Sequence, residues 1–270
     1  MKVRLFSIII VLSIMILSLT GCSNNEVAEY TQPNGTAGDI KTEENVVENA
    51  VESTTENAKT RVVDTIDYKA AAEKQLAMPE KGDTVAVIKV KDYGAIKVKF
   101  FEDVAPKAVE NFLTHAKNGY YDGVIFHRVI NDFMIQTGDP LGNGTGGESI
   151  WGEGFGEELD FELVPYRGAL SMASTGKGRN GLGSQFYIVQ GKYNHEYDNY
   201  MQENNFPNGL IEQYRIHGGY PTSLYLNYTI FGQVYEGMDI VDKIAAVETD
   251  VTNDKPYKDV VVEKIIVTEY

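Results

Sequence analysis

Tyr121-Asp-Gly-Val-Ile-Phe-His-Arg-Val-Ile-Asn-Asp-Phe-Met-Ile-Gln-Thr-Gly-Asp139 is a long, mostly apolar run with strand-like character and a single arginine, Arg128. A guanidinium stays charged in proteins, and burying it without a partner is costly. A half-buried strand whose arginine reaches out to water would explain the pattern. A fold that needs the fixed fork of donors inside an apolar site would explain it equally well. The residue types alone leave both interpretations open.

Further segments follow in the chain: Gly168-Ala-Leu-Ser-Met-Ala173 with Gly183-Ser-Gln-Phe-Tyr-Ile188, and then Tyr228-Thr-Ile-Phe-Gly-Gln-Val-Tyr-Glu-Gly-Met-Asp239. Together with the first run they resemble the motifs of the cyclophilins, the cyclosporin-binding family of peptidyl-prolyl isomerases. The resemblance covers roughly Thr84 to Val267. Long matches in the family's own order are far more specific than any short pattern.

Hydrophobic periodicity predicts a mainly β domain. Residues 84–91 and 96–100 alternate apolar and polar side chains around the turn Asp92-Tyr-Gly94, which predicts a β-hairpin with one solvent-exposed face. Pro106 suits the first turn of a helix that ends at Gly119, and residues 237–246 and 260–267 predict a second helix and a final strand. Many short strands with two helices favour a closed antiparallel barrel. The resemblance implies the same fold class: an eight-stranded antiparallel barrel capped by two helices.

Length and charge narrow the possible functions. The chain has 270 residues, of which 43% are hydrophobic, and a net charge of −15. Residues 22–80 carry 5 basic and 12 acidic side chains, and residues 81–270 carry 17 and 27. Because phosphate binding needs basic patches, these two acidic parts argue against a nucleic-acid partner. They also argue against electrostatic attachment to anionic lipid.

The first 22 residues are typical of an export signal. Lys2 and Arg4 form a positive start, and residues 6–17 form an apolar region too short for a comfortable membrane span. The sequence Leu19-Thr20-Gly21-Cys22 resembles a bacterial lipobox, which implies cleavage before Cys22 and lipidation of its thiol. An ordinary signal peptide or an anchor helix is the alternative. Cys22 is the only cysteine, so the chain cannot form an intramolecular disulfide.

We therefore predict three parts: a lipoprotein signal peptide over 1–21, a flexible acidic tether over 22–80 and a cyclophilin-like domain over 81–270. Residues 23–63 contain few large apolar side chains and cannot offset the entropy of ordering, which predicts disorder. Asp67 is a candidate cap for a short helix over 68–78, which Pro79 would end. This helix either packs on the domain or acts as a stiff spacer.

Other motifs do not predict a different chemistry. Gly142-Asn-Gly144-Thr-Gly-Gly147 fits a dinucleotide-binding pattern, but no helical period follows it, so a glycine-rich loop beside the site is the better interpretation. The four histidines lack the paired spacing of a metal site, and no serine or cysteine is placed as a nucleophile. His127 neighbours Arg128, so on a strand it is expected on the opposite face, as a core residue or a support behind the site and not as a catalyst. We expect neither a metal nor a cofactor.

The resemblance implies a set of site residues. Arg128 and Gln136 are the expected catalytic residues, with Gln136 holding the substrate backbone and orienting the guanidinium. The expected substrate-binding residues are Phe133, Met134, Ala173, Ser174, Gln185, Tyr187, Leu224 and Tyr228. Without the resemblance, Phe133, Met134 and Tyr187 would be assigned to the core.

The chain departs from the family pattern in two places. Residues 191–222 form a longer segment than the equivalent loop of compact relatives, and Leu210, Ile211 and Tyr214 at helical spacing predict one short helix within it. Ser223 stands where many relatives carry a tryptophan.

The sequence thus predicts a lipid-anchored, extracytoplasmic peptidyl-prolyl cis–trans isomerase that acts on X–Pro bonds of exported or surface proteins. Its expected partners are proline-containing polypeptides and, through a lipid on Cys22, the cell membrane. We expect the protein to be a monomer. A non-catalytic chaperone or scaffold with a cyclophilin fold is the alternative. A solute-binding lipoprotein is disfavoured, because its two-lobed α/β pattern is absent from the sequence.

Overall fold

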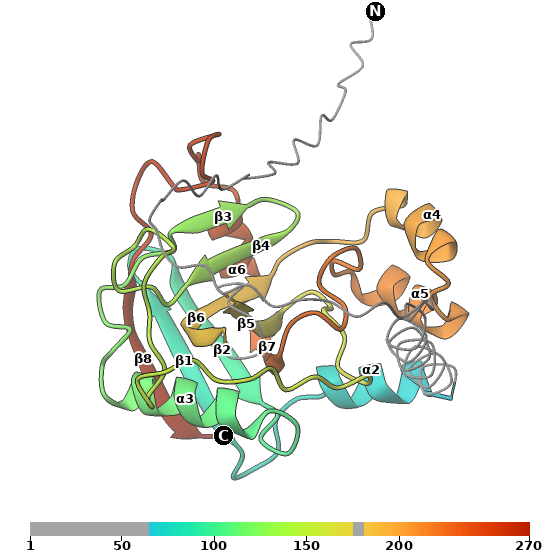
Figure 1. Cartoon of the computed structure of the whole chain (residues 1–270), viewed down its shortest axis with the longest axis horizontal. Coiled ribbons are helices and arrows are strands. Elements are labelled where there is room, and N and C mark those ends of the chain that lie inside the picture. Colours follow the sequence, from blue (N-terminus) through green and yellow to red (C-terminus); the bar gives the residue numbers. More distant parts are fainter. Residues whose placement is uncertain (1–64, 175–180) are drawn as a thin grey trace, which may run out of the picture. The chain divides into compact units, whose positions relative to one another are not determined.

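The computed structural model describes residues 65–174 and 181–270, which form a curled antiparallel sheet with helices around it (Figure 1). The predicted signal peptide, Cys22 and most of the predicted tether lie outside these residues. The eight strands are β1 (Thr84–Val90), β2 (Gly94–Phe100), β3 (Arg128–Ile130), β4 (Met134–Thr137), β5 (Ala169–Ser174), β6 (Leu182–Val189), β7 (Ile230–Glu236) and β8 (Val262–Glu269). Their order in the sheet is β3-β4-β6-β5-β7-β2-β1-β8.

The two ends of the sheet meet where the chain enters β3. Ile125 forms an antiparallel bridge with Val261, and the Phe126 N–H donates to the Val260 carbonyl over 2.9 Å. The segment before β3 therefore pairs with the segment that leads into β8. This pairing covers strand edges that would otherwise be open, as the prediction of an eight-stranded antiparallel barrel requires. That prediction is confirmed.

Two helices complete the barrel core, as predicted. Helix α3 (Pro106–Lys117) has Pro106 in its first turn and buries Val109, Phe112 and Ala116. Helix α6 (Met238–Ala245) follows β7 and buries Val241 and Ile244 in the same core. Apolar side chains at helical spacing explain both elements, because each helix has one stripe that can pack against the inner face of the sheet.

Three further helices lie beside the barrel and share a second apolar cluster. They are α2 (Tyr68–Leu76), α4 (Glu196–Glu203) and α5 (Asn208–His217). Helix α2 is capped by the Asp67 side chain and contributes Tyr68 and Ala72 to this cluster. The short helix predicted in residues 191–222 is confirmed as α5, whereas α4 is a second helix there that the sequence did not predict. Helix α4 is mostly polar, and Met201 is its one fully buried hydrophobic residue, so periodicity gave no signal for it.

One buried amide fastens α2 to the rest of the fold. Gln75 donates to the Val164 carbonyl over 2.8 Å and accepts from the Val164 N–H over 3.0 Å, so its side chain pairs with this residue as a neighbouring strand would. It also donates to the Gln233 side chain on β7. Gln75 is only 1% exposed. The helix is thus packed on the domain, and it is not a spacer held apart from it.

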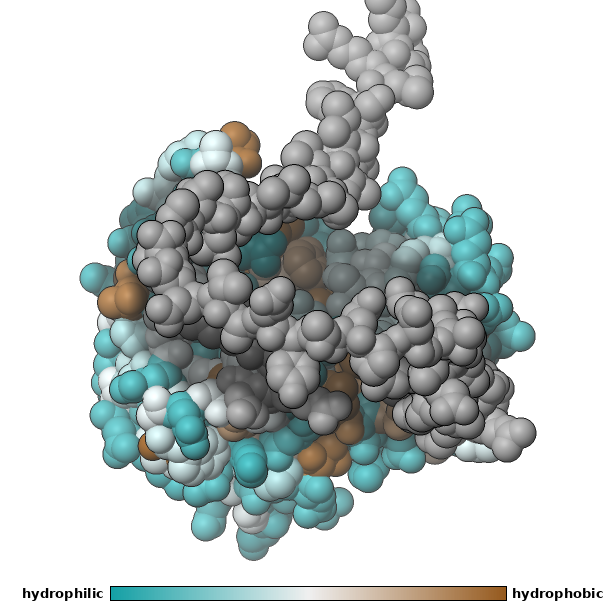
Figure 2. All heavy atoms as spheres, viewed as in Figure 1, coloured by the Kyte–Doolittle hydropathy of each residue, from teal (hydrophilic) through white to brown (hydrophobic). Residues whose placement is uncertain are grey.

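Hydrophilic side chains cover most of the visible surface of the described residues (Figure 2). Among these residues, no helix combines the length and apolar character that crossing a membrane requires.

We predict that Gln75→Leu lowers the free energy of unfolding by about 1–3 kcal/mol, because it leaves the buried Val164 N–H without its acceptor and removes the Gln75 donor from the Gln233 side chain. The Val164 carbonyl keeps the Tyr166 N–H as its donor. Urea unfolding followed by circular dichroism measures the change. Glu73→Gln on the exposed side of α2 is the control and should change stability by less than about 0.5 kcal/mol. Equal effects of the two substitutions would contradict the role of this amide.

Candidate active site

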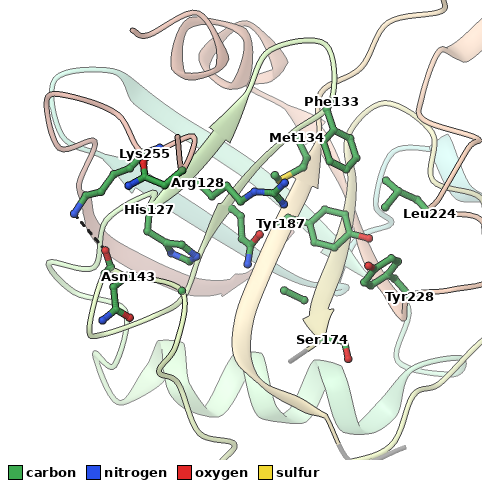
Figure 3. Close-up of a pocket in the computed structure, with 15 residues that line it drawn as sticks. His127, Arg128, Phe133, Met134, Asn143, Ser174, Tyr187, Leu224, Tyr228 and Lys255 are labelled. Carbon is green, nitrogen blue, oxygen red and sulfur yellow. Dashed lines mark hydrogen bonds between the residues drawn. The ribbon is translucent and has the colours of Figure 1, made fainter. Parts of the chain in front are cut away.

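A cavity of about 560 Å³ opens beside β3, β4, β5 and β6 (Figure 3). Its wall combines charged, polar and apolar side chains from these strands and from the adjoining loops: His127, Arg128, Phe133, Met134, Gln136, Gly142, Asn143, Gly144, Ala173, Ser174, Tyr187, Leu224, Tyr228, Asn253 and Lys255. The structure therefore brings together all of the residues predicted for catalysis and substrate binding except Gln185.

The register of the sheet places three of these side chains in one row. Arg128 on β3 pairs directly with Gln136 on β4, and Gln136 pairs directly with Tyr187 on β6. Side chains of directly paired residues project from the same face of a sheet. A cation, an amide and an aromatic ring therefore face the cavity together, although they are far apart in the chain.

The cavity has an apolar end and a polar end. Phe133, Leu224 and Tyr228 lie on one side in Figure 3, and His127, Asn143 and Lys255 lie on the other. The Arg128 guanidinium lies between them and points toward Met134 and Tyr187. The rings of Tyr187 and Tyr228 meet edge to face, with their centroids 5.7 Å apart. An apolar hollow with one adjacent fork of donors is the geometry that the resemblance implied.

His127 differs from its expected placement. It precedes β3 and is not part of the strand, so strand alternation does not apply to it, and it lines the cavity next to Arg128. Burial lowers the pKa of His127, and the neighbouring Arg128 lowers it further. We infer that the imidazole is neutral near pH 7.

Gln136 and Gln185 form a polar framework behind the cavity. The Gln136 side chain donates to the Gln185 side-chain oxygen over 2.9 Å. Gln185 in turn donates to the carbonyls of Gly144 and Gly146 in the glycine-rich loop. Gln185 is buried behind Gln136 and does not line the cavity. Gln185 thus links Gln136 on β4 to the glycine-rich loop through hydrogen bonds.

Asp139 holds the glycine-rich loop from inside. Its carboxylate is fully buried and accepts from the N–H groups of Leu141, Asn143 and Gly144 over 2.6–3.1 Å. Burial raises the pKa of Asp139, but the backbone donors together outweigh burial and hold the pKa below its ordinary value. Gly146 comes so close to this carboxylate that an added Cβ would collide with it. The backbone N–H groups of this loop thus surround the Asp139 carboxylate, which is a structural role and not that of a nucleotide-binding motif.

Sequence reasoning missed one turn of the site. Residues 250–255 place Asn253 and Lys255 in the cavity wall, and Asp254 forms an ion pair with Arg128 over 3.3 Å. Lys255 also donates to the Gly142 carbonyl in the glycine-rich loop. Polar residues in a turn carry no periodicity, so only their crowding in Thr249-Asp-Val-Thr-Asn-Asp-Lys255 could have marked the segment.

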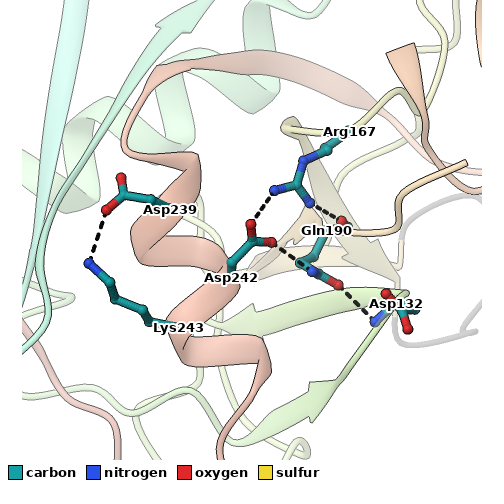
Figure 4. Close-up of polar contacts among 6 residues, drawn as sticks. All are labelled: Asp132, Arg167, Gln190, Asp239, Asp242 and Lys243. Atoms are coloured by element: carbon teal, nitrogen blue, oxygen red, sulfur yellow. Dashed lines mark hydrogen bonds and ion pairs between the residues drawn. The ribbon is translucent and has the colours of Figure 1, made fainter. Parts of the chain in front are cut away.

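The turn that carries Phe133 is tied to α6 through a polar network (Figure 4). The Asp132 N–H donates to the Gln190 side chain, which donates to Asp242 on α6, and each of these bonds measures 2.8 Å. Arg167 pairs with the same Asp242 carboxylate over 2.6 Å. The Gln190 N–H also donates to the Phe133 carbonyl. The β3–β4 hairpin is therefore held at its tip, which stabilises the apolar end of the cavity.

The long insertion also contacts this end. The ring centroids of Tyr220 and Phe133 are 4.2 Å apart, and Tyr197 on α4 packs edge to face against Tyr220. Leu224, the second residue after the insertion, lines the cavity. Residues 191–222 thus help to shape the apolar end, although they lie outside the barrel.

Comparison with known proteins identifies the family of this arrangement. Residues 85–267 match the family model "Cyclophilin type peptidyl-prolyl cis-trans isomerase/CLD". The chain belongs to the cyclophilin-type peptidyl-prolyl cis–trans isomerases.

Relatives whose own length is almost fully covered by the match support the assignment. A Staphylococcus epidermidis protein named "Putative peptidyl-prolyl cis-trans isomerase" is 45% identical over 196 residues, which are 72% of this chain and 98% of that protein. A Staphylococcus aureus protein of the same name is 45% identical over 68% of this chain and 92% of its own. Among solved structures, a Cryptosporidium parvum cyclophilin crystallised in the presence of the dipeptide Ala-Pro is 32% identical, with a TM-score of 0.55 over 69% of this chain and 99% of that chain.

We predict that Asp139→Asn lowers the free energy of unfolding at pH 7 by about 1.5–3 kcal/mol, because an amide cannot accept all of the loop's N–H groups. The pKa of this carboxyl is lower in the folded protein than in the unfolded chain, where it is about 3.9. The carboxylate therefore stabilises the fold at pH values above the unfolded pKa, and this contribution is lost as pH falls through the folded pKa. The difference between variant and wild type should therefore shrink below about pH 4. Urea titrations from pH 3 to 7 test this, with exposed Asp259→Asn as control, and a deficit that stays constant with pH would refute it.

We also predict that Tyr220→Ala raises the KM for a prolyl peptide about 2- to 10-fold, because Phe133 loses the ring that supports it. Tyr220→Phe keeps the ring and should behave like wild type. Steady-state isomerase assays on both folded variants decide the point. An unchanged KM in Tyr220→Ala would show that the insertion does not support the cavity.

Proposed function

We propose that this cyclophilin-type isomerase acts on X–Pro bonds of exported or surface proteins while anchored to the membrane by a lipid on Cys22. The observation that carries the catalytic part is the Arg128 guanidinium, which points into a cavity whose other end is apolar. The crystal structure of the Cryptosporidium parvum relative in the presence of Ala-Pro supports a proline-containing ligand for the same kind of cavity.

Rotation about an X–Pro bond breaks no covalent bond, and its barrier of about 18–20 kcal/mol comes from amide resonance. In the twisted transition state the prolyl nitrogen becomes pyramidal and regains a lone pair. A donor directed at that nitrogen binds the twisted state more tightly than either planar state, which lowers the barrier. This reaction needs no nucleophile, so a site built from a cation, amides and aromatic rings is sufficient.

The described side chains have distinct roles in this proposal. Arg128 supplies the donor to the prolyl nitrogen. Phe133, Met134, Tyr187 and Leu224 surround the proline ring, and the bound proline displaces water from the Arg128 donor. Gln136 holds the substrate backbone, with Ala173, Ser174 and Tyr228 along the same wall and Gln185 supporting Gln136 from behind. Removing water strengthens the Arg128 interaction, because charge–dipole attraction is larger in a medium of low dielectric constant.

A non-catalytic scaffold is the second candidate. It would need the same cavity for binding but would not depend on a donor at the prolyl nitrogen. The placement of Arg128 between the two ends of the cavity favours the enzyme.

We predict that Arg128→Ala lowers kcat/KM by about two decades or more, because it removes a contact made mainly in the transition state. A protease-coupled prolyl-peptide assay measures the loss. Arg215→Ala serves as control, since Arg215 pairs with Asp198 in the insertion and does not line the cavity. Folded Arg128→Ala protein with nearly full activity would remove Arg128 from the mechanism. A wild-type domain that binds prolyl peptides without isomerising them would favour the scaffold.

The cellular part of the proposal rests on the sequence before the described residues. Lys2 and Arg4, the short apolar region and Leu19-Thr20-Gly21-Cys22 are together typical of a lipoprotein signal. A lipid there and an acidic tether would place the domain outside the cytoplasmic membrane, where newly exported chains fold. One acyl chain gives only marginal membrane binding, so anchoring would require more than one chain on the mature terminus.

We predict that Cys22→Ala abolishes lipid attachment and leaves the precursor uncleaved or cleaved elsewhere. Mass spectrometry of the mature N-terminus and separation of membrane from soluble fractions measure the effect. A wild-type N-terminus that carries no lipid would overturn the anchor and leave the catalytic proposal untouched.

A further inference from the structure

Arg128 is held on the side that faces away from the substrate. The Asp254 carboxylate accepts from Nε of Arg128 over 3.3 Å, across a separation of 126 residues in the chain. Among the described residues this is the one ion pair of Arg128. A guanidinium presents five N–H donors in a fixed fork. An acceptor at Nε therefore leaves both Nη groups to be directed into the cavity.

Backbone contacts hold Asp254 in place. Its carbonyl accepts from the Val129 N–H over 2.9 Å, next to Arg128 itself, and its N–H donates to the Asp250 carbonyl over 2.8 Å. Asp250 closes the turn by accepting from both the N–H and the hydroxyl of Thr252. The turn at 250–255 is thus bonded to β3 at the residue that follows Arg128, which holds the backbone of Asp254 beside the guanidinium.

The backbone conformation of Asp254 is also unusual. Its φ of +61° lies in the left-handed region, which glycine and asparagine tolerate well and most other side chains do not. This conformation provides matched substitutions that remove the charge and preserve the turn.

Both side chains of the pair are partly open to water, with 43% of the Arg128 side chain and 39% of the Asp254 side chain exposed. Surface pairs of this kind contribute little to global stability. A long arginine side chain, however, has many rotamers, and a catalytic donor must be held within a fraction of an ångström of its productive position. The pair is therefore better suited to orienting Arg128 than to stabilising the fold.

We propose that Asp254 is a positioning residue for isomerisation: it fixes the Nε side of Arg128 so that the Nη donors face the prolyl nitrogen. The inference rests on the proposed role of Arg128. Asp254 does not contact the substrate, so its loss lowers the fraction of enzyme with a correctly placed donor and leaves the apolar wall that binds proline intact.

Two variants test the proposal, Asp254→Asn and Asp254→Gly, because both accept the left-handed backbone. We expect kcat to fall about 3- to 10-fold in each, with KM unchanged within about twofold. Exposed Asp259→Asn removes the same charge outside any ion pair of the described residues and should leave both parameters unchanged. Raising ionic strength should lower kcat of the wild type, because salt screens the pair, and should not change kcat of Asp254→Asn.

A double-substitution cycle separates positioning from any other role. In an Arg128→Lys background, Asp254→Asn should have little further effect, since Lys has no Nε–H fork to orient. An equal loss in both backgrounds, an unchanged kcat in folded Asp254→Asn and Asp254→Gly, or a loss confined to KM would each overturn the inference. If Arg128→Ala is inactive while both Asp254 variants are fully active, only this inference fails. If Arg128→Ala is fully active, the catalytic proposal itself fails.

Discussion

The antiparallel pairing of β3, β4 and β6 is the constraint on which the site depends. Direct pairing of Arg128 with Gln136, and of Gln136 with Tyr187, places their side chains on one face. A slip of one residue would turn all of them to the other face. The bonds between the tip of the β3–β4 hairpin and Gln190 therefore maintain the geometry of the proposed site as well as the sheet.

Two carboxylates, the buried Asp139 and the half-buried Asp254, hold the loops around the row of Arg128, Gln136 and Tyr187 in different ways. Asp139 collects backbone N–H groups and shapes the glycine-rich loop, and Asp254 reaches across from the C-terminal turn to Arg128. Lys255 joins the two loops through the Gly142 carbonyl. The polar end of the cavity is thus a connected network, whereas the apolar end is held by ring contacts. This division suits a reaction in which a proline ring must be desolvated while a single donor keeps its charge.

The helices outside the barrel extend the family fold. Helix α2 precedes the residues that match the family model, yet Gln75 pairs with Val164 deep in the domain. Helices α4 and α5 share its apolar cluster, and Tyr220 at the end of the insertion packs on Phe133. The insertion is thus buried against α2 through this cluster and contacts the cavity wall through Tyr220. It supports the apolar end of the cavity.

Alternation and helical stripes in the sequence predicted an antiparallel barrel and the helices α3 and α6, because these patterns are local properties of the chain. The resemblance carried by its long ordered motifs supplied the family, the number of strands and most of the cavity wall. The sequence did not determine the helix α4, the cavity lining by His127 or the ion pair of Arg128 with Asp254. Helix α4 is polar, His127 precedes the strand whose alternation was assumed, and Asp254 lies 126 residues from Arg128. Only the tertiary structure decided these features, because closure of the sheet brings the two ends of the domain together and no local pattern encodes which polar turn will meet the exposed side of a distant strand.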